Sequence, residues 1–150
     1  MRVEAHGLAV TAPAGWEVAI TRRPALGAER TGPVLHAATV ALPAGRGDYG
    51  AGVVEALGPD DVFVALLDFG ADDAGSPLFA AAALPVLTPD VFRPKAMQRV
   101  IPGQAGVQRF FTVAGRAFCL YAVIGAYGRR AFLSPKVNGL IGALEIAPLR

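Results

Sequence analysis

Few side chains of this sequence could perform catalysis. Histidine occurs only at His6 and His36, and serine only at Ser76 and Ser134. A catalytic triad requires a histidine beside a nucleophile and a carboxylate, and the sequence contains no G-x-S-x-G pattern to present a nucleophilic serine. His36 lies in an apolar stretch, which is typical of a hydrogen-bonded structural histidine. The sequence therefore does not favour hydrolase chemistry.

Cys119 is the only cysteine, so an internal disulfide is excluded. Its neighbours are apolar, and burial among them would raise rather than lower the pKa of the thiol. We expect an inert core residue and not a nucleophile.

A glycine-rich stretch at 44–52, AGRGDYGAG, precedes a short helical segment predicted at 53–57. A glycine-rich turn that leads into a helix N-terminus can cradle phosphate. Here Gly50 and Gly52 supply G-x-G, but Glu55 stands at the third glycine position and the Walker lysine is absent. An acidic residue there would repel phosphate, so the pattern predicts a structural loop.

Several aspartates offer the oxygen ligands that calcium and magnesium prefer. They are Asp60, Asp61, Asp68, Asp72 and Asp73. Their spacing matches no EF-hand loop, and we predict no metal site and no cofactor. Asp68 differs from the others because it lies within an apolar strand-like run, where a buried carboxylate needs a partner. An arginine from the second half of the chain is the expected partner.

The net charge of +2 conceals an uneven distribution. Residues 1–90 hold five arginines and eleven acidic residues, a net charge of −6, whereas residues 91–150 hold nine basic residues and only Glu145, a net charge of +8. Acidic and basic strands could lie side by side and compensate each other, or the basic half could form a face for an anionic partner.

Four arginines of the basic half are candidate partner-binding residues: Arg109, Arg116, Arg129 and Arg130. Guanidinium groups can grip carboxylates of a protein partner bidentately. Nucleic acid is a less favoured partner, because the basic residues are dispersed singly and no RNP, helix-turn-helix or zinc-finger pattern accompanies them.

The composition is that of a globular domain. The chain has 150 residues, of which 53% are hydrophobic and 17% charged, and this length is most economically one domain. The longest apolar runs are shorter than a bilayer span. The first residues do not resemble a secretory signal. We therefore expect a single domain, 1–150, in the cytoplasm.

A β-hairpin at 107–126 organises the predicted fold, with a tight turn at Gly115-Arg116. Its second arm, 117–124, is apolar at every position, which places it centrally in a sheet with layers on both faces. We expect a helix on one face and an irregular or short helical layer on the other.

Other strands are predicted on each side of this hairpin. An N-terminal hairpin at 8–12 and 16–21 turns at Pro13-Ala14-Gly15, with Trp16, Val18 and Ile20 facing the core. A polar connection follows at 22–33. Further strands are predicted at 34–42, 62–69, 96–100 and, as an edge strand, 146–149. The segment 78–102 is otherwise irregular because prolines interrupt it.

Ser134 and Pro135 predict the start of a helix, because serine can cap it and proline is tolerated in its first turn. Val137, Leu140, Ile141 and Leu144 form one apolar stripe. We expect Gly139 and Gly142 to permit close approach of this helix to the sheet.

This order of elements predicts an α+β fold, with a mainly antiparallel β-sheet flanked by helices. With its APAGW turn, its terminal hairpin and its final SPKVNGLIGALEI helix, the chain resembles the PsbP-like α/β/α sandwich superfamily. That resemblance implies an accessory or binding module without a shared catalytic set, and it assigns no functional residue.

We therefore expect a non-enzymatic accessory domain that binds a protein partner through its loops and its basic C-terminal half. One alternative is a small-ligand or divalent-cation-binding domain, with a cavity between sheet and helix or the aspartates at 60–73. Another is a structural subunit of a larger assembly, with an exposed edge strand that pairs with a neighbour.

Overall fold

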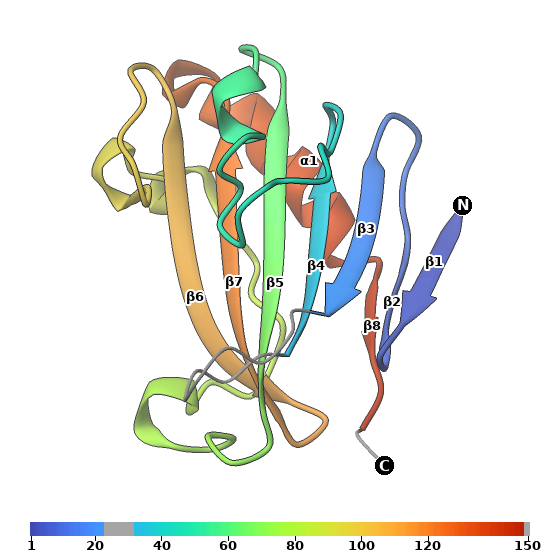
Figure 1. The fold of residues 1–150 in the computed structure, drawn as a ribbon. Helices are drawn as coiled ribbons and strands as arrows, with labels where there is room; N and C mark the ends of the chain where they lie inside the picture. Colours follow the sequence, from blue (N-terminus) through green and yellow to red (C-terminus); the bar gives the residue numbers. More distant parts are fainter. Residues whose placement is uncertain (23–31, 149–150) are drawn as a thin grey trace.

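A five-stranded antiparallel sheet forms the centre of the protein. The computed structural model describes residues 1–22 and 32–148, and Figure 1 shows its architecture. The strand order is β3-β4-β5-β7-β6. The bounds are Glu17–Arg22 for β3, Pro33–Ala38 for β4, Val62–Gly70 for β5, Ala105–Val113 for β6 and Arg116–Ile124 for β7.

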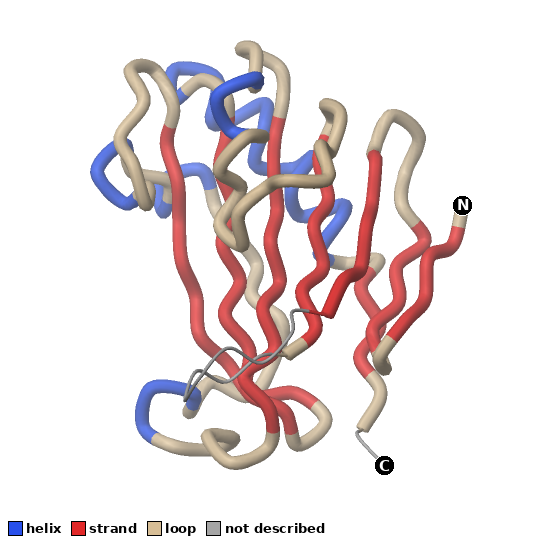
Figure 2. The backbone as a smooth tube through the Cα atoms, in the orientation of Figure 1, coloured by secondary structure: helices blue, strands red, loops and turns tan. Residues whose placement is uncertain are grey.

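A smaller antiparallel sheet with the order β1-β2-β8 lies beside it (Figure 2). Its strands are β1 (Arg2–Ala5), β2 (Leu8–Thr11) and β8 (Leu144–Ile146). One α-helix, α1 (Arg130–Ile141), is described, and the remaining helical pieces are single 3₁₀ turns. They are η1 (Val54–Ala56), η2 (Pro77–Phe79), η3 (Pro89–Val91), η4 (Pro94–Ala96) and η5 (Tyr127–Arg129).

Both faces of the five-stranded sheet are covered. On one face, sheet residues such as Leu120 share a core with Leu140 of α1 and Leu8 of β2. On the other face, Tyr121 packs with Met97 and with residues around η1. In Figure 1, α1 lies behind the sheet and the segment around η1 lies in front. The expected helix on one face and irregular layer on the other are confirmed.

The β6–β7 hairpin is confirmed, with a shift in its turn. All nine residues of β7 are buried, because β7 lies between β5 and β6 in a sheet covered on both faces. The turn residues are Ala114 and Gly115, both with positive φ, between the paired residues Val113 and Arg116. A two-residue turn of this type needs positive φ at both central positions. The prediction of a Gly115-Arg116 turn is wrong by one residue.

The predicted N-terminal hairpin is wrong in its pairing. β2 pairs with β1 on one edge and β8 on the other, so no edge is left for β3. The hairpin partner of β2 is β1, and their turn uses His6 and Gly7, both at positive φ. Trp16, at the start of the β3 segment, packs against the core from a partly buried position, as expected.

The helix begins at Arg130, five residues before Pro135, which was predicted as its first residue. Ser134 lies inside α1 and donates its hydroxyl to Leu87 O at 2.5 Å, so its side chain serves a tertiary contact and not a cap. Pro135 leaves the carbonyl of Ala131 without its helical donor, but both residues are exposed and water can reach that carbonyl. Leu144 of the predicted apolar stripe is buried in β8 and not in the helix.

The other expectations have mixed outcomes. The strand predicted at 34–42 ends at Ala38, and β5 matches its prediction closely. No strand forms at 96–100. The last edge strand is β8, two residues earlier than expected. Most of the predicted polar connection at 22–33, and Leu149, lie outside the described residues.

The irregular segment 78–102 is tied to the rest of the fold at several points. Thr112 N donates to Ala81 O at 2.7 Å, and Arg93 exchanges two backbone hydrogen bonds with Gly106. Between these points, Asn138 of α1 accepts from Leu87 N and donates to Leu87 O, both at 2.8 Å. The segment therefore has a fixed path although it contains no long regular element.

The described residues have an α+β fold of mostly antiparallel strands in two sheets with one short helix. The predicted fold class is confirmed at this level. The PsbP-like sandwich stays a prediction.

A buried ion pair connects β5 to β7. The Arg116 side chain is 0% exposed and the Asp68 side chain 2% exposed. Arg116 Nη2 lies 2.5 Å and Nε 3.2 Å from Asp68 Oδ2. The other carboxylate oxygen accepts from Gly70 N at 2.8 Å. The expectation that Asp68 pairs with an arginine of the second half is confirmed.

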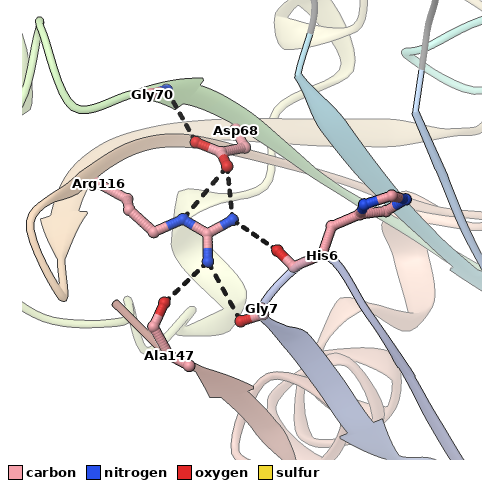
Figure 3. Close-up of polar contacts among 6 residues, drawn as sticks. All are labelled: His6, Gly7, Asp68, Gly70, Arg116 and Ala147. Atoms are coloured by element: carbon pink, nitrogen blue, oxygen red, sulfur yellow. Dashed lines mark hydrogen bonds and ion pairs between the residues drawn. The ribbon is translucent and has the colours of Figure 1, made fainter. Parts of the chain in front are cut away.

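The same guanidinium group joins the two sheets (Figure 3). It donates to His6 O at 3.0 Å and Gly7 O at 3.2 Å in the β1–β2 turn, and to Ala147 O at 2.8 Å after β8. A guanidinium group has five N–H donors, and all five have acceptors here. A Cβ atom on Gly7 would lie 2.6 Å from Arg116 Nη1, so glycine allows this approach.

We expect Arg116→Met to lower the free energy of unfolding by about 3–5 kcal/mol, because it leaves the buried Asp68 carboxylate without its cation and removes one donor from each of three backbone carbonyls. Urea denaturation would measure the loss. Arg109→Met on the exposed side of β6 is the matched control and should change stability by less than about 0.5 kcal/mol. Similar small losses in both variants would contradict a structural role for Arg116.

Candidate functional site

Cationic and aromatic side chains gather at the exposed start of α1. We call this group the α1 surface. It consists of Tyr127, Arg129, Arg130, Phe132 and Lys136. These residues follow one another through η5 and the first turns of the helix.

Phe132 is the centre of the α1 surface and is 56% exposed. The guanidinium carbon of Arg129 lies 4.7 Å from the centroid of its ring, and Lys136 Nζ lies 5.5 Å from it. Arg130 stacks on the ring of Tyr127 at 4.2 Å and donates to Tyr127 O at 3.0 Å. Cation–π contacts at exposed sites are weak, about 0.5–1 kcal/mol each. They hold these long side chains in place without removing them from solvent.

Asp60 lies next to the α1 surface and orients two of its cations. Arg129 Nε lies 2.6 Å from Asp60 Oδ1, and Lys136 Nζ donates to Asp60 O at 3.0 Å. The ion pair is exposed, so it adds little to stability. With three cations and one carboxylate, the patch keeps an excess of positive charge.

A shallow hollow of about 390 Å³ adjoins the α1 surface. It lies between α1 and the turn that leads from β2 to β3, and its walls include Trp16, Pro135, Lys136 and Gly139. Lys136 belongs to both the hollow and the α1 surface. A Cβ atom on Gly139 would meet nothing within 4 Å, so the expected close approach of Gly139 to the sheet is wrong. Gly139 faces the hollow and leaves it open.

Only two of the four predicted partner-binding arginines lie together. Arg129 and Arg130 belong to the α1 surface, whereas Arg116 is fully buried and saturated with hydrogen bonds. The prediction that Arg116 contributes to an exposed surface is therefore wrong. The sequence predicted that Asp68 is buried and pairs with an arginine, but it did not identify Arg116 as that arginine.

Arg109 lies apart from the α1 surface, on the edge strand β6. It donates to Gln108 O at 3.0 Å and lines a different hollow, with Asp90 and Arg93. Sequence reasoning also missed Phe132 and Lys136. Their i, i+4 spacing could have indicated that they lie on one helix face, but the helix was predicted to start at Ser134, after Phe132.

Ion pairs between the two halves of the chain offset part of the charge asymmetry. Arg116 pairs with Asp68, Arg129 with Asp60 and Arg99 with Glu55. Each of these pairs joins a basic residue of 91–150 to an acidic residue of 1–90, whereas Arg2 and Glu145 join the two halves with the charges reversed. Compensation between acidic and basic segments therefore accounts for part of the uneven distribution.

His36 has a structural role, as expected. It is 2% exposed, and its Nδ1 accepts from Arg46 Nε at 2.7 Å. Nε2 therefore carries the proton and donates to Asp48 O at 2.8 Å. These bonds fasten the loop 44–52 to β4.

The glycine-rich loop and the aspartates offer no evident ion site within the described residues. Glu55 Oε1 accepts from Gly52 N at 2.7 Å, so a carboxylate already occupies an amide that a phosphate would use. Asp61 accepts from Thr39 Oγ1 and from Gly58 N. In the part of the chain that the structure describes, no three His, Cys, Asp or Glu side chains come together as a metal would require.

Comparison of the chain with protein-family models, with curated proteins and with solved structures found no match. The resemblance to the PsbP-like superfamily therefore rests on the sequence motifs alone. Within residues 1–22 and 32–148, no helix has the length and apolar character that crossing a membrane requires.

Burial raises the pKa of the Cys119 thiol, which is 0% exposed. At mildly alkaline pH the thiol therefore stays protonated in the folded protein, and we expect no alkylation by iodoacetamide until the protein unfolds. Intact-mass spectrometry would measure labelling in buffer and in concentrated guanidinium chloride. Ala131→Cys, on exposed α1, is the control and should gain one label in buffer. Equally fast labelling of Cys119 in buffer would contradict its burial.

Gly139→Ala should raise the free energy of unfolding by roughly 0.5–1 kcal/mol, because alanine favours a helix and its Cβ meets open space. Gly15→Ala is the matched control. Its Cβ also meets open space, but Gly15 has φ +90°, so we expect a loss of about 1 kcal/mol or more. Thermal or urea unfolding of both variants would measure the difference. The two variants should change stability in opposite directions. A change of the same sign in both would contradict this explanation, which rests on backbone strain at Gly15 and open space around Gly139 in the helix.

Proposed function

We propose that this protein is a non-enzymatic accessory domain that binds an acidic segment of a protein partner at the α1 surface. The observation that carries the proposal is the exposed Phe132 ring, which both Arg129 and Lys136 contact, next to a mostly apolar hollow. Aromatic residues and arginine are enriched in protein interfaces and carry much of their binding energy.

Charge selects the class of partner. The α1 surface has three cations, two of which also contact Asp60. Carboxylates on a partner would complement this excess, and an apolar side chain of the same segment could enter the hollow beside Trp16 and Pro135. Complementary charge mainly sets the association rate and specificity, while the buried apolar contact slows dissociation.

The positions of reactive residues support a non-enzymatic role. His36 is fixed between Arg46 and Asp48, and Cys119 is buried with a raised pKa. Ser134 donates its hydroxyl to Leu87 O, and Ser76 donates to Asp73 O. Each of these side chains has a structural hydrogen bond or a buried environment. We also propose a cytoplasmic location for this domain.

Selection of a random peptide library on the immobilised protein tests the proposal. We expect enriched peptides that combine Asp or Glu with a bulky apolar residue. Arg129→Glu with Arg130→Glu should weaken their binding about tenfold or more, because charge reversal turns attraction into repulsion. Titration calorimetry would measure the dissociation constants.

The matched control is Arg93→Glu with Arg109→Glu, which makes the same change of charge at the other hollow. Its binding should stay within about twofold of the original protein, since distant charges are screened. The Arg129 and Arg130 variant should lose less than about 1 kcal/mol of stability, because the pair with Asp60 is exposed. Equal loss of binding in both variants, or binding of anionic vesicles or nucleic acid in place of peptides, would contradict the proposal.

A further inference from the structure

A further cavity lies on the opposite face of the central sheet from α1. It has a volume of about 270 Å³ and lies between the loop 47–55 and the segment 97–99. Its apolar walls are formed by Tyr49, Val54, Met97 and Tyr121, and Glu55 and Arg99 stand among its polar residues. Because it lies on the other face, it is independent of the α1 surface.

Tyr121 offers this cavity a buried hydrogen-bond donor. The residue is 1% exposed, and its hydroxyl oxygen accepts from the backbone N–H of Gln98 at 2.9 Å. Because the oxygen serves as the acceptor in this bond, the hydroxyl keeps its own hydrogen to donate. Burial raises the pKa of Tyr121, so the group stays protonated. Gln98 also lines the cavity, which places this end of the tyrosine at its wall.

The aromatic wall favours a flat ligand. Tyr49 meets Tyr121 edge to face, with ring centroids 5.5 Å apart and an interplanar angle of 80°. The bond from Gln98 N fixes the position of the Tyr121 hydroxyl, which is therefore the group we expect to meet a ligand. Rings that pack edge to face attract a further aromatic ring in the same way.

The polar residues of the cavity favour an uncharged ligand. Glu55 accepts from Gly52 N and pairs with Arg99 Nη2 at 3.3 Å. Because these two side chains offset each other's charge, they offer little attraction to a carboxylate or ammonium ligand, whereas a neutral acceptor such as a carbonyl needs no counter-charge. The volume lies just below the range of about 300–1,000 Å³ typical of ligand pockets, which limits the ligand to one small ring system.

The walls are fixed without a ligand. His36 of β4 holds the loop, because it donates to Asp48 O and accepts from Arg46 Nε. Gly50 has φ +86°, and a Cβ atom there would lie 2.6 Å from the Phe63 ring. The loop is therefore seated directly on the sheet, and binding would require little ordering of the chain.

We propose that this cavity binds a small, neutral, aromatic molecule with a carbonyl-type acceptor, and that the Tyr121 hydroxyl donates to that acceptor. Acetophenone and ethylbenzene are suitable probes, because they have nearly the same shape and only the first has a carbonyl. Titration of each probe would be followed by the amide NMR signals of Gln98 and Tyr121. A fragment of this size binds with a dissociation constant on the order of millimolar.

We expect acetophenone to bind about three- to tenfold more tightly than ethylbenzene, the effect of one hydrogen bond. Tyr121→Phe should remove this preference and keep the apolar contacts, and the control Tyr127→Phe on the α1 surface should preserve it. Ala51→Trp, at an exposed lining position, should fill the cavity and abolish binding of both probes.

Equal binding of the two probes by the original protein would overturn the role of Tyr121. The absence of saturable shifts at Gln98 and Tyr121 would overturn the cavity as a site for this class of ligand. Circular dichroism would verify that the variants fold. If Tyr121→Phe does not fold, Ala51→Trp still tests whether the probes bind in this cavity. Neither result depends on peptide binding at α1, so the two proposals can fail separately.

Discussion

The charge of Arg116 is compatible with the interior only because every donor of its guanidinium group has an acceptor. This condition constrains several distant parts of the chain. A bulge in β5 between Asp68 and Gly70 accompanies the carboxylate, and the two positive-φ residues of the β1–β2 turn present their carbonyls to the same group. Ala147 supplies the last acceptor just after β8. The small sheet is thus attached to the large one through a charge as well as through apolar packing.

The two proposed sites differ in how the fold builds them. The α1 surface consists of neighbouring residues of η5 and the start of α1, so its geometry follows from helical spacing and from the exposed contacts with Asp60. The cavity at Tyr121 is assembled from β7, the loop 47–55 and the segment 97–99. It depends on the hydrogen bonds of His36 and on the contact of Gly50 with the sheet. A change in core packing would therefore disturb the cavity more than the α1 surface.

The sequence predicts the elements whose signal is local and strong. The continuous apolar run of β7 indicated its central position, and the isolated carboxylate of Asp68 required an arginine. The pairing of β2 could not be predicted, because alternation shows which face of a strand is buried but not which strand lies beside it. Ser134 and Pro135 predicted a helix start that is wrong, because the Ser134 hydroxyl donates to Leu87 O and does not cap the helix. Phe132 was therefore not recognised as a helical residue. The cavity residues come from three separate stretches, so no spacing could reveal them.

The side-chain amide of Asn138 bonds both backbone groups of Leu87, because it accepts from Leu87 N and donates to Leu87 O. A neighbouring β-strand would form the same kind of paired hydrogen bonds. Together with the bonds at Ala81 and Arg93, Asn138 divides the segment 78–102 into short spans between fixed points. Extra residues inserted within one span would bulge outward locally, because the ends of that span are held by α1 and β6. The segment can therefore vary in contour length without moving the sheet, which makes it the natural place for this fold to accept insertions.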